Sequence, residues 1–261
     1  MSRHRARKRF GQHFLRDPGV VGRIVDAIAP RANDITVEIG PGEGVLTRKL
    51  AEQVTPLHAV EFDRDLVSRL RAEFPPQRVI VHEADALDFD FRKLASSAQR
   101  LRVVGNLPYN ISTPLLFHLL EQVDCIADMV FMLQKEVVDR LAAPPDTSDY
   151  GRLSVMIQWR LKVERLFDVG PEAFDPPPKV DSAVVRLTPH AAAPIVVRDP
   201  HVFAGVVRAA FAHRRKMLRN NLKDVIPNEQ LAALGIDPQR RAETLTLAEF
   251  ARIADSLVSR C

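Results

Sequence analysis

Short apolar runs alternate with amphipathic segments through the first two thirds of the chain, and this alternation restricts the fold more than any other feature. Five runs have the length and apolar content of buried strands: ITVEIG, LHAVEF, RVIVHEAD, RVVGN and DMVFMLQ. Three segments between them carry apolar residues at helical spacing: GVLTRKLAEQV, RDLVSRLRAEF and TPLLFHLLEQV. Strands and helices repeated in this order predict an α/β fold with a parallel sheet.

The last third of the chain follows a different pattern. The run VDSAVVRLTP reads as a late strand, expected to be antiparallel and at the end of the set, and TPHAAAPIVVRDP after it has the composition of a linker. From about Asp199 onward only helical periodicity remains, in HVFAGVVRAAF, NEQLAAL and LAEFARIADSLV. We therefore predict two domains, a catalytic α/β domain over 1–192 and a small all-helical domain over 193–261.

Composition narrows the class of protein. The 261 residues are 46% hydrophobic and 27% charged, which is typical of a soluble globular protein, and no apolar run approaches the roughly 20 residues that cross a bilayer. Two cysteines, Cys125 and Cys261, supply neither a disulfide framework nor a zinc site. We expect a cytoplasmic protein without a structural metal or a membrane partner, and a monomer by default.

Basic residues are clustered although the net charge is only +4. The N-terminus is rich in Arg and Lys from Arg3 to Arg9, and no acid interrupts the stretch from Arg208 to Lys223. Clusters of this kind attract polyanions, most commonly nucleic acids. The candidate RNA-binding residues in the second stretch are Arg214, Arg215, Lys216 and Arg219. The alternative is a solvated helix face and a frayed tail.

The segment VEIGPGEG, Val37 to Gly44, joins a predicted strand to a predicted helix. Its glycines at 40, 42 and 44 allow a sharp turn and a close approach of the backbone to a ligand, while amides at the start of the helix face that ligand. The dinucleotide fingerprint requires a glycine where Val45 stands, and the Lys-Ser/Thr pair of a phosphate-binding loop is missing. The segment predicts a nucleotide-type pocket, with a plain tight turn as the alternative.

Polar residues stand at the ends of the next predicted strands at regular intervals. Glu61 follows Gly40 by 21 positions, Asp85 follows Glu61 by 24, and Asn106 follows Asp85 by 21. Each interval is about one strand, helix and return, so these residues are expected at the carboxyl edge of one parallel sheet, where ligands bind. A carboxylate at Glu61 suits two ribose hydroxyls and Asp85 suits an adenine amine. Without a cation for a phosphate, the pocket fits S-adenosylmethionine.

The sequence Asn106-Leu107-Pro108-Tyr109 ends the fourth predicted strand. The side-chain carbonyl of Asn106 and the backbone carbonyl of Leu107 can accept hydrogen bonds from the amino group of a flat base, while Tyr109 stacks on its ring. Two acceptors favour a more tetrahedral nitrogen aimed at a methyl sulfonium, so orientation and electrostatics replace a strong general base. The segment predicts methyl transfer to an aryl amine.

These motifs resemble the ribosomal RNA adenine N6,N6-dimethyltransferases that act on the small subunit. The likeness covers most of the chain, in the order KRFGQHFL, VEIGPGEG, VEFDRDL, GNLPYNISTPLLFHLL, FMLQKEVVDRL, YGRLSVM, FDPPPKVDSAVVRL and RRKMLRNNL. The resemblance implies a Rossmann-like class I methyltransferase sheet and dimethylation of two adjacent adenines in the 3′-terminal hairpin of 16S-type RNA, with a role in subunit biogenesis. It also implies that Phe174 is a second aromatic stacking on the base, and that the cofactor-binding residues are His13, Leu15, Gly40, Gly42, Glu61, Asp85 and Asn106.

Two other classes of function remain open. A related enzyme that dimethylates large-subunit RNA shares the cofactor motifs, although NLPYNISTPLLFHLL and YGRLSVM look more like the small-subunit group. A non-catalytic ribosome-assembly or transcription factor on the same scaffold need not keep the cofactor residues, which are all present here. A nicotinamide dehydrogenase is disfavoured by Val45 and by the lack of a hydride-transfer constellation.

Overall fold

The computed structural model describes residues 13–96 and 99–258, and the basic N-terminal arm lies outside this part of the chain. The chain folds into two compact units. The first contains residues up to 138 together with 163–189, and the second contains 139–162 together with the chain from 190 onward. This division differs from a single boundary after residue 192, because the chain enters the second unit twice.

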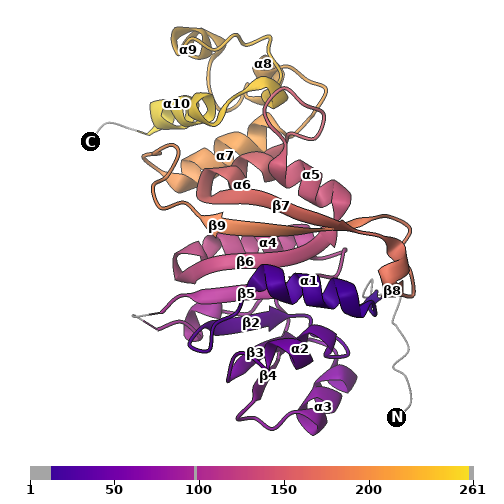
Figure 1. Ribbon diagram of the computed structural model, residues 1–261. Coiled ribbons are helices and arrows are strands. Elements are labelled where there is room, and N and C mark those ends of the chain that lie inside the picture. The colour runs from indigo at the N-terminus through magenta and orange to yellow at the C-terminus, as the bar shows by residue number, and fades with distance from the viewer. Residues whose placement is uncertain (1–12, 97–98, 259–261) are drawn as a thin grey trace. The chain divides into compact units, whose positions relative to one another are not determined.

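A seven-stranded sheet occupies the first unit, in the order β4-β3-β2-β5-β6-β9-β7 (Figure 1). The first five strands of that order are parallel, and β9 runs antiparallel to β6, with Phe131 opposite Val185. An antiparallel late strand is confirmed, but β7 and not β9 is at the edge. The strand bounds are β2 Ile35–Ile39, β3 Leu57–Glu61, β4 Val79–Glu83, β5 Leu101–Asn106, β6 Ile126–Gln134, β7 Leu161–Val169 and β9 Ser182–Pro189.

A second, two-stranded sheet lies beside the N-terminal segment. Strand β1 (Phe14–Leu15) pairs antiparallel with β8 (Phe174–Asp175), so that Leu15 lies opposite Phe174. The amide of Arg16 continues this pairing by donating to the carbonyl of Ala173 at 2.7 Å. Residues separated by about 160 positions in the sequence therefore lie side by side.

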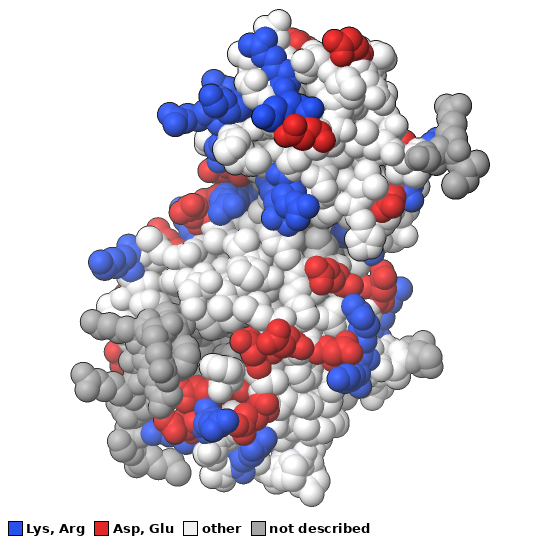
Figure 2. Space-filling view, turned by 180° about the vertical axis from the view of Figure 1, so that it is seen from behind, with Lys and Arg blue, Asp and Glu red and all other residues white. Residues whose placement is uncertain are grey.

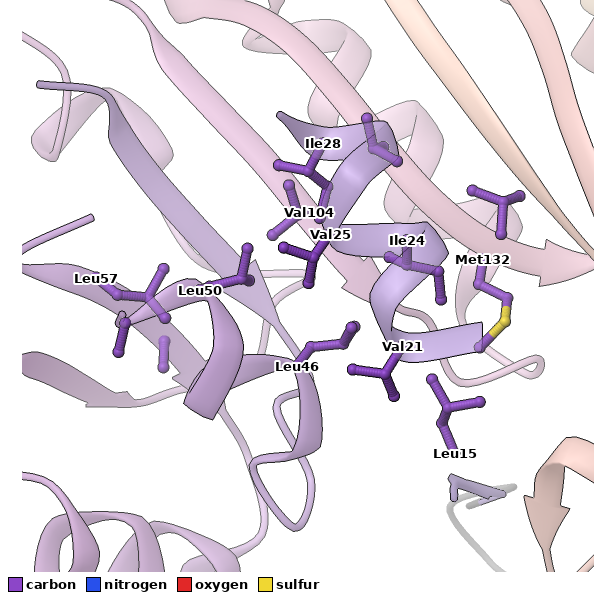
Figure 3. Packing of buried hydrophobic residues seen from close by; sticks show 14 of the residues in the cluster. Leu15, Val21, Ile24, Val25, Ile28, Leu46, Leu50, Leu57, Val104 and Met132 are labelled. Carbon is purple, nitrogen blue, oxygen red and sulfur yellow. The ribbon is translucent and has the colours of Figure 1, made fainter. Parts of the chain in front are cut away.

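Helix α1 (Pro18–Ile28) covers one face of the sheet, and no helix was expected there. The side chain of Asp17 accepts from the amides of Gly19 and Val20, and the helix begins at Pro18, a residue favoured in the first turn. Its buried face packs into a cluster with residues of α2 (Val45–Leu50) and of the sheet (Figure 3). Each fully buried Val, Leu or Ile stabilises the fold by about 1.5–3 kcal/mol.

Two further helices complete the first unit. Helix α3 (Arg64–Glu73) follows β3 and begins at Asp63, whose carboxylate accepts from the amide of Asp65 at 3.0 Å. Helix α4 (Ser112–Glu121) follows β5, and Figure 1 shows it behind the sheet while α1 lies in front. The α/β fold expected from the alternating pattern is thus confirmed, with helices on both faces of the sheet.

The second unit is helical. Its described residues from 190 onward contain helices and no strand apart from an isolated bridge between Met217 and Arg241. Thr246 and Glu249 form a capping box at the start of α10. No helix within 13–96 or 99–258 is both long and apolar enough to cross a bilayer. The helices are α5 Lys135–Ala142, which continues into this unit, α6 Arg152–Arg160, α7 Pro200–Ala210, α8 Leu218–Asn221, α9 Asn228–Ala233 and α10 Leu247–Leu257.

Candidate active site

A cavity of about 260 Å³ lies in the first unit at the carboxyl ends of the parallel strands. The predicted site residues come from four strand ends and from the N-terminal segment, as the spacing of the motifs implied. Those lining the cavity are His13, Leu15, Gly40, Gly42, Glu61, Asp85, Asn106, Leu107 and Tyr109. The structure therefore brings together nine of the ten residues proposed for catalysis and cofactor binding.

The glycine-rich turn forms one wall of the cavity. Gly40, Gly42 and Gly44 have φ angles of +65°, +58° and +76°, a region that other residues rarely adopt. A Cβ atom at Gly42 would also lie 3.3 Å from the ring of Phe14. Glycine at 42 thus allows both the turn and the close approach of strand β1, and the backbone is left bare toward the cavity.

Glu61 ends strand β3 and is held by backbone amides. Its Oε1 accepts from Phe62 and Asp63 at 2.9 Å each, and its Oε2 accepts from Gly42 at 3.2 Å. Burial raises the pKa of Glu61, and the three amides oppose that shift. A carboxylate fixed in this way is a preorganised acceptor for hydroxyl donors.

Glu38 on strand β2 is a second buried carboxylate lining the cavity, and the sequence reasoning did not select it. Thr47 on α2 donates to its Oε2 at 2.7 Å. Burial raises the pKa of Glu38 to about 7, the hydrogen bond from Thr47 lowers it, and the nearby Glu61 raises it. The available signal was an acid inside an otherwise apolar strand, because a buried charge is costly unless it has a role or a partner.

Asn106 and Leu107 lie where strand β5 leaves the sheet. The side-chain nitrogen of Asn106 donates to the carbonyl of His13 at 3.2 Å, so its side-chain oxygen remains the group for a ligand. The amide of Leu107 donates to the carbonyl of Met132 at 3.2 Å. These two hydrogen bonds fix the backbone and the amide plane of Asn106 at the cavity.

Tyr109 is anchored at its hydroxyl. Its oxygen lies 2.7 Å from Oγ of Ser182, and burial raises the pKa of the phenol. The ring of His13 stacks on that of Tyr109 with centroids 5.4 Å apart and an angle of 30° between the planes. His13 is itself held by Pro176, whose carbonyl lies 2.8 Å from Nδ1 and so places the proton on that nitrogen. One face of Tyr109 is therefore covered by a positioned imidazole.

Phe174 is the predicted site residue that the structure does not bring to the cavity. It is 5% exposed, belongs to the hydrophobic cluster of α1 and the sheet, and does not line the cavity. The pairing of β8 with β1 fixes this position, because Phe174 lies opposite Leu15. In this structure Phe174 is a core residue and not an exposed stacking surface.

The four candidate RNA-binding residues lie on the second unit, between α7 and α8 and at the start of α8. All four are exposed, and Figure 2 shows Lys and Arg side chains gathered on this unit. Nε of Arg214 lies 3.4 Å from Glu243, and the amide of Arg219 donates to the carbonyl of Pro238 at 2.9 Å. The segment is therefore attached to the 238–243 loop while the charged ends of Arg215, Lys216 and Arg219 remain at the surface.

The fold and the cavity together define a class of protein. The cavity has a glycine turn after the first parallel strand, a carboxylate after the second and an acid after the third, yet no Lys or Arg is among the described residues that line it. This donor set fits a ribose, an adenine amine and a positively charged tail, and it does not fit a pyrophosphate. The chain is a class I S-adenosylmethionine-dependent methyltransferase.

Comparisons with known proteins identify the family. The model of the family described as ribosomal RNA adenine dimethylase matches residues 3–259. The ribosomal RNA small subunit methyltransferase A of Laribacter hongkongensis is 58% identical over 255 residues, covering 98% of this chain and 97% of its own. The protein of the same name from Pseudomonas aeruginosa is 55% identical and covers 97% and 95%. The chain belongs to the ribosomal RNA adenine dimethylase family.

Solved structures agree with this assignment. A dimethyladenosine transferase from Plasmodium falciparum superposes with a TM-score of 0.77 at 25% identity, covering 92% of this chain and 96% of its own. The 23S rRNA methyltransferase ErmE superposes with a TM-score of 0.69 at 26% identity, covering 94% and 99%. The enzyme class and the cofactor expected from the sequence are confirmed.

Proposed function

We propose that this enzyme dimethylates the N6 amino groups of two adjacent adenines in the 3′-terminal hairpin of small-subunit ribosomal RNA. The observation that carries the proposal is the side-chain oxygen of Asn106, held beside Tyr109 at the cavity by the hydrogen bond from its amide nitrogen to His13. Support for the small subunit comes from relatives at 58% and 55% identity that are named for it. The activity belongs in the cytoplasm, in small-subunit biogenesis, and a monomer suffices for it.

Cofactor binding is assigned to the walls of the cavity. Gly40 and Gly42 allow the backbone to approach the tail, Glu61 accepts from the ribose hydroxyls, and Asp85 accepts from the adenine amine. His13 and Leu15 close the remaining side, because β1 is held there by β8. The bound cofactor supplies an electrophilic methyl group.

Activation of the target amine is assigned to Asn106 and Leu107. Their two carbonyl oxygens accept the two N6 hydrogens, which fixes the direction of the nitrogen lone pair. The proton displaced on methylation leaves to solvent, so no general base is required. Tyr109 stacks on the base, and stacking returns about 1–3 kcal/mol of the few kcal/mol that extrusion of the base costs.

The second unit is proposed to bind RNA. Arg214, Arg215, Lys216 and Arg219 are exposed on one short segment, and exposed guanidinium and ammonium groups pair with phosphates. A base cannot be gripped strongly by one stacking face alone, so we expect contacts with the rest of the particle to supply much of the binding free energy. This explains why an adenine within a subunit, and not free adenosine, is the substrate.

The test uses purified protein with labelled S-adenosylmethionine and either unmethylated small-subunit particles or large subunits, followed by digestion and mass spectrometry of the nucleosides. Dimethyladenosine from small subunits alone is the expected result. Label only in large subunits would move the substrate to that of the 23S-type neighbour. Label in neither, with cofactor binding intact, would support an assembly factor in place of the enzyme.

A further inference from the structure

The charges around the cofactor cavity are all of one sign. Nucleotide pockets usually contain a cation for the phosphates, but none of the described lining residues is a Lys or Arg. Five carboxylates line the cavity: Glu38, Glu43, Glu61, Asp63 and Asp85. Glu43 is compensated, because Nη2 of Arg16 lies 2.5 Å from its Oε2. The remaining acids give the cavity a negative potential that favours a cationic occupant.

Glu38 is the most deeply buried of these acids. It is 1% exposed, against 7% for Glu61, and its one hydrogen bond within the described residues is the 2.7 Å bond from Thr47. Glu61 on β3 is the charged neighbour that acts on it, and it also is an acid. No basic group of the described cavity wall therefore compensates Glu38, and its second carboxylate oxygen has no partner there.

The reaction changes the charge of the occupant. Methyl transfer breaks the bond between the sulfonium sulfur and the methyl carbon, and both electrons of that bond remain on the sulfur. The lone pair of N6 forms the new bond to the methyl carbon, and one N6 proton leaves to water. The substrate of the cavity is a sulfonium cation and the product, S-adenosylhomocysteine, is an uncharged thioether at the same atom.

We propose that Glu38 is a specificity-determining residue, the buried counter-charge that makes the cavity bind S-adenosylmethionine more tightly than S-adenosylhomocysteine. Methyl transfer then weakens the binding of its own product. An uncompensated carboxylate in a site of low dielectric gains most from a single positive charge and gains nothing from a neutral sulfur. The proposal rests on the assignment of this cavity to the cofactor.

A pH dependence follows from the same geometry. With a pKa of about 7, Glu38 is mostly protonated at pH 6 and mostly ionised at pH 8. A bound cation lowers that pKa, so binding at pH 6 must release a proton, and the affinity for the sulfonium rises as pH increases through 7. A thioether has no such linkage. The titratable groups around the cavity are Glu61 on β3, Asp63 before α3, Glu43 in the glycine turn, Asp85 after β4, His13 and Tyr109.

The experiment is calorimetric binding of S-adenosylmethionine and S-adenosylhomocysteine at pH 6, 7 and 8, in buffers of different ionisation enthalpy, to the wild type, Glu38→Gln and Glu43→Gln. Wild type is expected to prefer the sulfonium and to release protons on binding it. Glu38→Gln should lose about tenfold of that preference, the size of a one-unit pKa change, together with the proton release. Glu43→Gln, an acid of the same cavity already paired with Arg16, should keep both.

The variant Thr47→Val gives a second, independent measurement. It removes the hydrogen bond that stabilises the ionised form of Glu38, so the midpoint of the pH dependence should move to higher pH. The proposal is overturned if Glu38→Gln retains the preference and the proton release, or, should that variant not fold, if Thr47→Val leaves the midpoint unchanged. If the wild type binds neither compound, the cofactor assignment itself is wrong and the role of Glu38 fails with it.

Discussion

Asn106 is the residue whose removal separates catalysis from cofactor binding. Asn106→Ala removes one of two acceptors for the target amine, so turnover at saturating cofactor should fall by more than about tenfold while the cofactor dissociation constant changes less. Turnover is measured by methyl incorporation into small-subunit particles and affinity by calorimetry. A turnover within about tenfold of the wild type would contradict the acceptor role.

Tyr109 combines two functions that substitution can separate. Tyr109→Phe keeps the ring and removes only the hydrogen bond with Ser182, so its KM for the particle should stay near that of the wild type. Tyr109→Ala removes the stacking surface and should cost about 1–3 kcal/mol in kcat/KM. Equal losses in the two variants would mean that the hydroxyl, and not the ring, matters. Steady-state kinetics with a saturating cofactor distinguish these results.

Phe174 has a structural prediction of its own. Because the ring is buried in the cluster of α1 and the sheet, Phe174→Ala should reduce the free energy of unfolding by about 3–5 kcal/mol, and Phe174→Leu by clearly less. Denaturant unfolding measures both. A stacking role would instead leave stability intact and raise the KM for the particle in Phe174→Leu, so this variant decides between the position seen here and the role implied by resemblance.

Among the strands, the pairing of β2 with β5 depends on a glycine. A Cβ atom at Gly105 would collide with the carbonyl oxygen of Ile39. Gly105→Ala should therefore force the two strands apart and lower the midpoint of thermal unfolding, with a loss of cofactor affinity because Gly40 and Asn106 follow these strands. Gly205→Ala, on α7 with nothing within 4 Å of the added atom, is the control and should not destabilise the protein.

The elements with strong periodic patterns were the ones that could be predicted. Strands β2 to β6 are apolar runs, and helices α3 and α4 show clear helical spacing, because one face of each is buried. Strand β7 was missed, since as an edge strand only its ends, Leu161 and Val169, are fully buried. Strands β1 and β8 have two residues each, too few for any pattern. Helix α1 did carry a signal, in Asp17-Pro18 and the spacing of its apolar residues.

The site was predictable to the extent that it depends on strand ends. Gly40, Glu61, Asp85 and Asn106 are placed by the regular repeat of the parallel sheet, which the sequence displays. Phe174 depends on the pairing of β8 with β1, an interaction between distant segments that local patterns do not encode. The grouping of 139–162 with the helical unit has the same origin, in hydrogen bonds such as that from the amide of Asp146 to Glu243.

At the scale of the whole molecule, the basic cluster should control how binding responds to salt. Replacing Arg214, Arg215, Lys216 and Arg219 by Gln should flatten the dependence of log affinity on log salt by about 0.7–0.9 for each phosphate that is no longer neutralised. Lys49→Gln, on α2 beside Glu52, is the control cation and should leave the slope unchanged. An unchanged slope in the quadruple variant would return the cluster to an ordinary solvated surface.

Synthesis of the chain sets the time at which the cofactor can bind. The wall formed by His13 and Leu15 is held by Phe174 and Pro176, so about 160 residues separate the first part of the cavity from the part that fastens it. A nascent chain that has exposed β2 to β6 outside the ribosomal tunnel still lacks β8 and cannot close this wall. The enzyme therefore becomes able to hold its cofactor only after about two thirds of it has been translated.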